Sequence, residues 1–317
     1  MTTLTVRDVP LHHDDPAARL RRTAAAVRVH FTWWGVRRAL SNAQKEEIGD
    51  AYAAEARLIS ASKKLIDTRH EAFRKLTGIR TRVQQFWRGL TLPYVEAGIR
   101  LLRQSDIELF THTLQGFQEE LTQAEADLNA VYESIKGDAR QRLGRLYDAG
   151  DYPSEIRHLF ALDFDFPSVE PPAYLLRLAP DVYRQEQQRV AARFEEAVRL
   201  AEQAFVAELS QLVAHLTERL TAGPEGAKKV FRDSAVGNLT EFFERFRSLN
   251  IGSNAQLDAL VEQAQQIVRG VEPQALRGQE GLRQQVAAQL GQVQAALDGM
   301  LIDAPRRRIV RHSEPRA

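Results

Sequence analysis

The chain has 317 residues, of which 44% are hydrophobic and 27% charged, and its formal net charge is +1. These proportions are typical of a folded chain rather than a disordered one, and the length allows one large domain or two ordinary ones. The absence of cysteine excludes disulfides, thiolate metal sites and cysteine nucleophiles, and it fits the cytoplasm, where we expect the protein to lie. We expect no signal peptide and no transmembrane helix, because no stretch is apolar enough for either.

Two segments show the alternation of a half-buried β-strand. In residues 27–34 valine and aromatic side chains alternate with polar ones, and in residues 159–166 Phe and Leu alternate with Asp163 and Asp165. We predict that the two strands pair, because a lone strand leaves its backbone groups without partners. The two aspartates share one side of their strand, where they form either a carboxylate pair or simply a solvent-facing edge.

Three long segments show the three-to-four-residue spacing of amphipathic helices. Apolar side chains in residues 42–91 recur every seven residues, which predicts a helix roughly 75 Å long with its likeliest bend at Gly78. Two heptad rows in residues 107–135 predict left-handed supercoiling against a partner helix, interrupted at Gly137. Residues 180–222 predict a third long helix, whose apolar positions follow an eleven-residue repeat.

Shorter helices are predicted at 225–249, 254–270 and 273–302. The sequence therefore predicts a mainly α fold, an elongated bundle of long antiparallel coiled-coil-like helices with a small β element at about 27–34 and 159–166. The predicted domains are an N-terminal arm with a strand (1–40), a long-helix coiled-coil region (41–222) with a β insertion (159–175), a C-terminal short-helix region (223–302) and a basic tail (303–317).

Basic residues gather at both ends of the chain. Residues 1–40 hold seven Arg against three Asp, and residues 303–317 hold five Arg against one Asp and one Glu. The densest group in the tail is Arg306, Arg307, Arg308 and Arg311. Such a tail can hold nucleic-acid phosphates without reading base sequence, or it can dock on a partner protein, or it can be a solvated end.

The candidate interface aromatics are Trp34, Trp87 and Tyr94, in a chain with only three Trp. Aromatic side chains dominate both protein cores and protein interfaces, so core packing is the alternative, and a base-stacking platform is a third. His70 lies within a charged stretch, where surface ion pairing competes with a functional cluster of titratable groups. Because we find no phosphate loop, metal-ligand spacing or catalytic constellation, we predict no cofactor, no metal and no enzymatic activity.

Three segments carry a resemblance to known proteins: SASKKLIDTRHEAF at 60–73, TLPYVEAGIRLLRQ at 91–104 and FPSVEPPAYL at 166–175. They resemble an uncharacterised family of helical bacterial proteins and, more weakly, domain-of-unknown-function proteins of phages and mobile elements. Those proteins tend to be encoded near MoxR-type ATPases and von Willebrand A-type proteins. The resemblance implies a cytoplasmic partner protein, such as a client or adaptor of an AAA+ ATPase, and it implies no catalytic residue.

The favoured hypothesis is a non-enzymatic helical scaffold or adaptor that acts through protein–protein interaction, including self-association. Long helices with sustained apolar seams often complete their burial against a partner chain. A second hypothesis is nucleic-acid binding through the basic ends. A third is a membrane-active helical protein with residues 159–175 as an inserting tongue, against which Asp163, Asp165 and Glu170 argue, because charges are costly in hydrocarbon.

Overall fold

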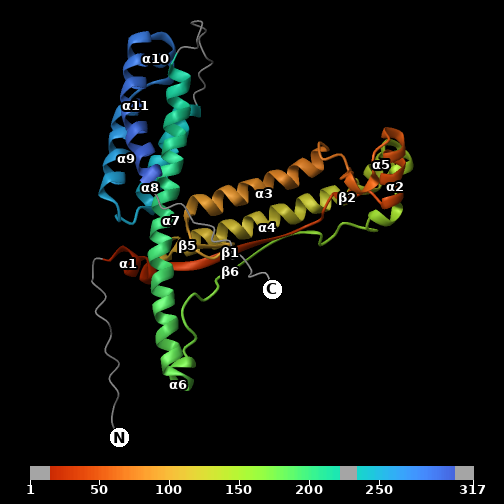
Figure 1. The fold of residues 1–317 in the computed structure, drawn as a ribbon, viewed down its shortest axis with the longest axis horizontal. Helices are drawn as coiled ribbons and strands as arrows, with labels where there is room; N and C mark the ends of the chain where they lie inside the picture. The colour runs from red at the N-terminus through yellow and green to blue at the C-terminus, as the bar shows by residue number, and fades with distance from the viewer. Residues whose placement is uncertain (1–14, 222–233, 304–317) are drawn as a thin grey trace, which may run out of the picture. The chain divides into compact units, whose positions relative to one another are not determined.

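The computed structural model describes residues 15–221 and 234–303, and this part of the chain is mainly α-helical with a small antiparallel sheet (Figure 1). The coarse prediction of fold class is therefore confirmed. The chain divides into two compact units, unit 1 and unit 2. The described part of unit 1 comprises residues 15–25, 91–101, 168–221 and 234–303, and unit 2 comprises residues 26–90 and 102–167.

In the described part of the chain, unit 2 combines strands with two long α-helices, α3 and α4, and two shorter ones, α2 and α5. Its elements in chain order are β1 (Ala24–Trp33, beginning in unit 1), β2 (Arg37–Ala39), α2 (Asn42–Tyr52), η1 (Ala56–Leu58), β3 (Ser62–Lys64), α3 (Glu71–Leu90), η2 (Gln104–Asp106), α4 (Ile107–Ala130), α5 (Tyr132–Leu143), η3 (Gly144–Leu146), η4 (Ala149–Asp151) and β6 (Phe160–Asp165).

Unit 1 is built mainly on one long helix, with shorter helices along it. Its elements in chain order are α1 (Pro16–Thr23), β4 (Thr91–Pro93), β5 (Ile99–Arg103, ending in unit 2), α6 (Leu175–Leu178), α7 (Pro180–Leu220), α8 (Ser234–Leu249), α9 (Ala255–Val268), α10 (Pro273–Gly278) and α11 (Glu280–Asp303).

The two predicted strands exist and pair with each other in the antiparallel sense, as β1 and β6. Opposite Val29 stands Phe164, and opposite Trp33 stands Phe160, so the apolar side chains of both strands share one face. That face contributes to the core of unit 2, in which Phe160 is buried. The alternation of apolar and polar residues is the cause, because it lets one face of the pair pack on helices α3 and α4 while the other meets water.

Helices α3 and α4 form an antiparallel pair with a constant register (Figure 1). Lys75 Nζ lies 2.6 Å from Asp127 Oδ2. One heptad further along α3, Arg82 pairs with Glu120, which lies one heptad back along α4. Most positions of the heptad rows predicted for residues 107–135 are therefore covered within unit 2, by α3 and by β6, whereas Val131 is 36% exposed.

The helix predicted over 42–91 is wrong in its first half, because α2 ends at Tyr52. Ala53 adopts a left-handed conformation, with φ 51° and ψ 40°, and the N–H of Ala54 donates to the carbonyl of Gly49 at 2.8 Å. This bond pattern is a Schellman motif, which satisfies the last carbonyls of a helix and turns the chain away from its axis. A side chain on Gly49 would meet the Ala54 carbonyl oxygen at 2.6 Å, so the tight turn requires glycine there.

The seven-residue spacing that suggested one long helix does not describe a continuous stripe. Leu58 is 78% exposed, whereas Leu65 is fully buried in the loop before α3. Between α2 and α3 the chain forms β3, which pairs with β2 in an unpredicted two-stranded sheet. Gly78 does not break the helix, since it lies inside α3.

The interruption expected at Gly137 lies instead at Val131. Val131 has φ −103° and ψ 2°, outside the helical region, and it separates α4 from α5. The break turns the next residue, Tyr132, into the core, where it contacts Trp34 edge-on and donates its hydroxyl hydrogen to the Pro153 carbonyl at 3.1 Å. The helix is thus interrupted directly before Tyr132, whose large side chain is buried in the core.

The third long helix is confirmed as α7, with Pro180 at its first position. Its buried side chains follow the eleven-residue repeat closely, with Ala197 and Val213 taking the places expected for Val198 and Leu212. The burial begins at Val190, so the first ten residues of α7 have no fully buried side chain.

Helix α11 packs along the second half of α7 in the antiparallel direction (Figure 1). The Gln294 amide donates to the Ser210 hydroxyl at 2.8 Å. At the end of α7, Leu220 lines a small pocket together with Glu280 and Arg283 at the start of α11. The helix predicted over 273–302 is in fact two helices, because Gln279 is extended between α10 and α11. The first part of the predicted 225–249 helix lies outside the described residues.

Candidate functional site

The candidate functional site is an exposed apolar surface in unit 1, where α6 meets the start of α7. We call it the apolar tip. Its members are Tyr174, Leu176, Leu178 and Val182, which are 56%, 46%, 77% and 45% exposed. Four of the ten most exposed large apolar side chains in the described part of the chain thus lie within nine consecutive residues. Single exposed apolar residues are ordinary, but such a cluster is typical of a surface that binds something.

Prolines position the apolar tip. Pro171 and Pro172 keep the approach extended, and α6 then makes a single helical turn. Ala179 breaks that turn with φ −152° and ψ 76°, and Pro180 begins α7 with its fixed φ. Helix α6 packs on the start of α7 in unit 1. Since a single turn is too short to bury both of its sides, Leu176 and Leu178 remain exposed, whereas Leu175 is partly buried.

Charged residues of alternating sign lie beside the apolar tip, along the start of α7. Arg184 pairs with Asp181 three residues earlier, and Arg189 Nη1 lies 2.7 Å from Glu186 Oε1. Asp181 is also favoured by the positive end of the α7 dipole. Asp181 and Arg184 are 91% and 69% exposed, and Arg189 is 53% exposed, whereas Glu186 is only 29% exposed. Charged and polar residues next to an apolar centre are typical of non-obligate protein interfaces.

Unit 2 has a cleft of about 510 Å³ between the 64–70 loop and α5, which contains the charged stretch noted around His70. Asp67 accepts hydrogen bonds from the backbone N–H of Arg69 at 2.9 Å and from Arg142 Nη1 at 2.9 Å. The guanidiniums of Arg69 and then Arg142 hold the pKa of Asp67 well below its usual range. Asp67 therefore stays ionised at physiological pH and is unsuited to general acid or base chemistry.

His70 caps α3 rather than facing a catalytic partner. The N–H of Ala72 donates to His70 Nδ1 at 3.3 Å, which places the ring proton of the neutral imidazole on Nε2. The N–H of Arg74 donates to the His70 carbonyl at 2.9 Å, as expected for the residue that begins a helix. The structure thus gives His70 a local structural role within this cleft.

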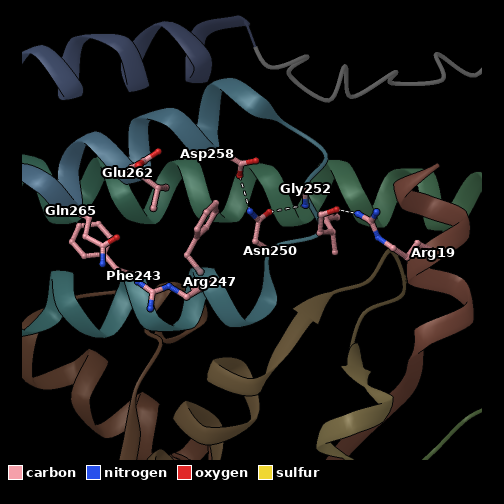
Figure 2. A pocket seen from close by; sticks show the side chains of 11 residues that line it. Arg19, Phe243, Arg247, Asn250, Gly252, Asp258, Glu262 and Gln265 are labelled. Atoms are coloured by element: carbon pink, nitrogen blue, oxygen red, sulfur yellow. Dashed lines mark hydrogen bonds between the residues drawn. The ribbon is translucent and has the colours of Figure 1, made fainter. Parts of the chain in front are cut away.

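A second cleft, of about 500 Å³, lies in unit 1 where α8 turns into α9 (Figure 2). Figure 2 shows that its polar groups face one another across the turn. Asn250 donates to Asp258 Oδ1 at 2.7 Å and accepts from the Gly252 N–H at 2.9 Å, while Arg19 of α1 donates to the Ile251 carbonyl. These bonds hold the turn in place and connect α1 to it. The polar groups of this cleft therefore stabilise the fold of unit 1.

Asp163 and Asp165 do not form the carboxylate pair that was one of the two alternatives predicted for them. Asp165 is engaged by Arg28, whose Nη2 lies 2.8 Å away, and its Oδ1 lies 3.2 Å from His30 Nε2. The Arg28 hydrogen bond, and more weakly His30, lower the pKa of Asp165. Asp163 is exposed opposite His30 in the strand register. The two aspartates belong to the polar face of the β1–β6 pair.

The three aromatics named from the sequence lie mostly in the cores. Trp34 is 8% exposed and contacts Tyr132 in unit 2, and Tyr94 is 6% exposed and contacts Phe194 in unit 1. Trp87 is half-buried on α3. Trp34 and Tyr94 thus expose little surface to a partner, and their roles as interface residues stay predictions. The four tail arginines, Arg306, Arg307, Arg308 and Arg311, lie outside the described residues.

The apolar tip was not identified from the sequence. Tyr174, Leu176 and Leu178 lie between the strand predicted at 159–166 and the helix predicted from residue 180, and Val182 lies at the start of that helix. The available signal was the segment YLLRL between Pro172 and Pro180, in which apolar residues are too many for a loop and too few for a packed helix.

Within residues 15–221 and 234–303, no group of three or more His, Asp or Glu side chains is arranged to hold a metal ion. In the same part of the chain, no helix combines the length and the apolar character needed to cross a membrane. Comparison with known proteins gives no match to a family model, to a curated protein or to a solved structure.

Proposed function

We propose that the protein is a non-enzymatic helical scaffold or adaptor, and that the apolar tip is its docking surface. The observation that carries the proposal is the exposure of Tyr174, Leu176, Leu178 and Val182 beside the mixed charges at the start of α7. Burying these side chains against a partner would remove apolar surface from water, at about 25 cal/mol per Å². The location that goes with this proposal is the cytoplasm.

Two finer elements of the hypothesis belong to the same proposal. The first is coiled-coil character, which the heptad-spaced ion pairs of α3 and α4 and the antiparallel packing of α7 with α11 support. The second is the partner, either an AAA+ ATPase of the MoxR type, as the sequence resemblance implies, or a further copy of the chain. The nucleic-acid and membrane hypotheses receive no specific support from the described residues: the tail arginines lie outside them, and residues 160–165 of the supposed tongue form strand β6.

Affinity capture from a lysate of the source cells, followed by quantitative mass spectrometry, tests the docking surface. The test variant is Leu178→Asp, and the matched control is Leu58→Asp, because Leu58 is equally exposed (78% against 77%) and also ends a single helical turn, but in unit 2. Far-ultraviolet circular dichroism checks that both variants fold. We expect the wild type and Leu58→Asp to retain the same proteins and Leu178→Asp to lose them. Equal capture by all three chains, or no capture by the wild type, would refute the proposal.

A further inference from the structure

Two cations face each other in the β2–β3 pair of unit 2. Arg37 stands opposite Lys64 in the antiparallel register, so the two side chains share one face. The Leu65 N–H donates to the Val36 carbonyl at 2.9 Å. The neighbouring pair, Arg37 with Lys64, is therefore non-hydrogen-bonded, the type in which facing side chains lie closest. Like charges directly opposite each other destabilise a sheet, and within the described part of the chain neither of these exposed side chains forms an ion pair.

Lys64 also lines the cleft of about 510 Å³ between the 64–70 loop and α5, together with two arginines. Arg69 and Arg142 both pair with Asp67, and they are 87% and 64% exposed. A guanidinium has five N–H donors, and the side-chain bonds to Asp67 use two on Arg69 and one on Arg142. Asp67 therefore keeps the two guanidiniums close together but neutralises the charge of only one.

The charged groups at this cleft leave a surplus of two positive charges, because four cations stand against two carboxylates. The cations are those of Arg37, Lys64, Arg69 and Arg142, and the carboxylates are those of Asp67 and of Asp138 on α5. A phosphate monoester carries a charge of about −1.5 to −2 at neutral pH and has three acceptor oxygens, and arginine forks bind such a group through parallel hydrogen bonds. The surplus thus matches one phosphate group.

The floor of the cleft is aliphatic. Its apolar lining residues are Leu65, Ile66, Ile135, Ala139 and Leu143, of which the first four are buried. Among the described residues that line it there is no Phe, Tyr or Trp, so the cleft offers no large ring on which a nucleobase would stack. Its volume lies in the range of about 300–1,000 Å³ that is usual for small-molecule pockets, which combine apolar walls with a few convergent polar groups.

We propose that this cleft binds an organic phosphate, a phosphate monoester joined to an aliphatic body. The phosphate contacts Lys64, Arg69 and Arg142 and relieves the repulsion between Lys64 and Arg37, and the aliphatic body covers the floor. This site belongs to unit 2, whereas the apolar tip belongs to unit 1. The inference therefore goes beyond the docking proposal, and the failure of either leaves the other standing.

Titration of the full chain, followed by nuclear magnetic resonance of isotope-labelled Ile, Leu and Val methyl groups, tests the proposal. The probe is n-hexyl phosphate. We expect saturable shifts of the Ile66, Ile135 and Leu143 methyl signals. Inorganic phosphate should bind more weakly, because it lacks the chain, and n-hexyltrimethylammonium, with the same chain and the opposite charge, should give no saturable shift.

Three results of this titration would overturn the proposal. The first is the absence of a saturable shift with n-hexyl phosphate, or an equal shift with the cation. The second is equally tight binding of inorganic phosphate, which would mean that the aliphatic floor plays no part. The third is tighter binding of adenosine monophosphate, which would replace the aliphatic body by a nucleoside.

Arg142→Gln and Lys64→Gln test the cations, and Arg157→Gln is the matched control. Arg157 is 66% exposed, pairs with an acid as Arg142 does, and lies in unit 2 outside the cleft lining. We expect each test variant to weaken the binding of n-hexyl phosphate roughly tenfold, since each loses a charge-assisted contact, and the control to bind as the wild type does. Equal binding by all four chains would refute the site.

The stability of the ligand-free protein gives an independent readout. Lys64→Gln removes the like-charge pair, so in phosphate-free buffer we expect its free energy of unfolding in urea to equal or exceed that of the wild type, while its affinity falls. A merely structural Lys64 would instead make the variant less stable. Such a loss of stability would contradict the assignment of Lys64 to ligand binding.

The same chemistry occurs in soluble phosphate esters and in lipids with a phosphate monoester headgroup. Cosedimentation with zwitterionic vesicles that contain phosphatidic acid separates these two sources. Retention on the vesicles that n-hexyl phosphate competes away would assign the phosphate to a lipid. Binding of n-hexyl phosphate without retention on vesicles would assign it to a soluble ester, and both outcomes support the site.

Discussion

The carboxylate of Glu125 in α4 accepts a hydrogen bond of 3.0 Å from the backbone N–H of Phe160, the first residue of β6. The same oxygen accepts from the Leu159 N–H, also at 3.0 Å. Four residues on, Asn129 accepts from the Ile156 N–H at 3.1 Å, and one heptad before, Gln118 donates to the Leu162 carbonyl at 2.8 Å. Three polar side chains on one face of α4 therefore hold the chain that leads into and forms β6.

Replacing Glu125 by alanine should lower the free energy of unfolding by about 2–4 kcal/mol, because two backbone N–H groups in a buried setting lose their acceptor. Glu125→Gln retains an acceptor oxygen at the same place and should cost less. Urea unfolding followed by circular dichroism measures both. A Glu125→Gln variant that is as unstable as Glu125→Ala would show that the charge, and not the acceptor, matters.

Lys63 should behave as the buried member of an ion pair. Its side chain is 5% exposed, and Nζ lies 2.6 Å from Asp151 Oδ2 and 2.6 Å from the Leu146 carbonyl oxygen. We expect Lys63→Ala to lower the free energy of unfolding by about 3 kcal/mol, since it leaves a partly buried carboxylate without its ammonium. Because Lys63→Met with Asp151→Asn removes both charges, the double variant should lose less than the sum of the singles. An additive double-mutant cycle would contradict this interpretation.

Ala53 holds a left-handed conformation that favours glycine. We expect Ala53→Gly to raise the free energy of unfolding by about 0.5–1 kcal/mol, because a Cβ is strained there. The control is Ala51→Gly, two residues earlier and within α2, where glycine should instead cost about 0.5 kcal/mol. Chemical denaturation of the two variants should thus give shifts of opposite sign. Destabilisation by both would mean that Ala53 is not left-handed in solution.

The strands were predictable because alternation and backbone pairing leave few choices. Residues 27–34 and 159–166 each have one apolar face, and each needs a partner for its backbone. In contrast, β2 and β3 have three residues each and no alternation, so their pairing follows from the turn after α2 rather than from any pattern of their own.

Helix boundaries and the candidate site were less predictable for a common reason. Apolar spacing shows which residues prefer burial, and the fold decides which of them obtain it. Leu58 and Leu65 belong to one heptad row, but one is exposed and the other buried, since the chain turns at Ala53. Leu178 is exposed because no neighbouring element in unit 1 covers it, a fact about other segments that its own sequence does not contain.

Alkaline pH should destabilise unit 2 through two buried tyrosines. Burial raises the pKa of Tyr132 and of Tyr152 to about 12, and their hydroxyls donate to the carbonyls of Pro153 and Leu65, at 3.1 Å and 2.7 Å, which a phenolate cannot do. In the unfolded chain tyrosine ionises near pH 10, so the unfolded state loses protons that the folded state retains. The stability contributed by the raised pKa is therefore complete below about pH 10 and is lost as the pH rises towards about 12.

Urea unfolding across this pH range should show a falling free energy of unfolding. The double variant Tyr132→Phe with Tyr152→Phe should make this decrease with pH smaller. At neutral pH it should cost about 1 kcal/mol per lost hydrogen bond. An unchanged slope in the double variant would assign the alkaline loss to other groups.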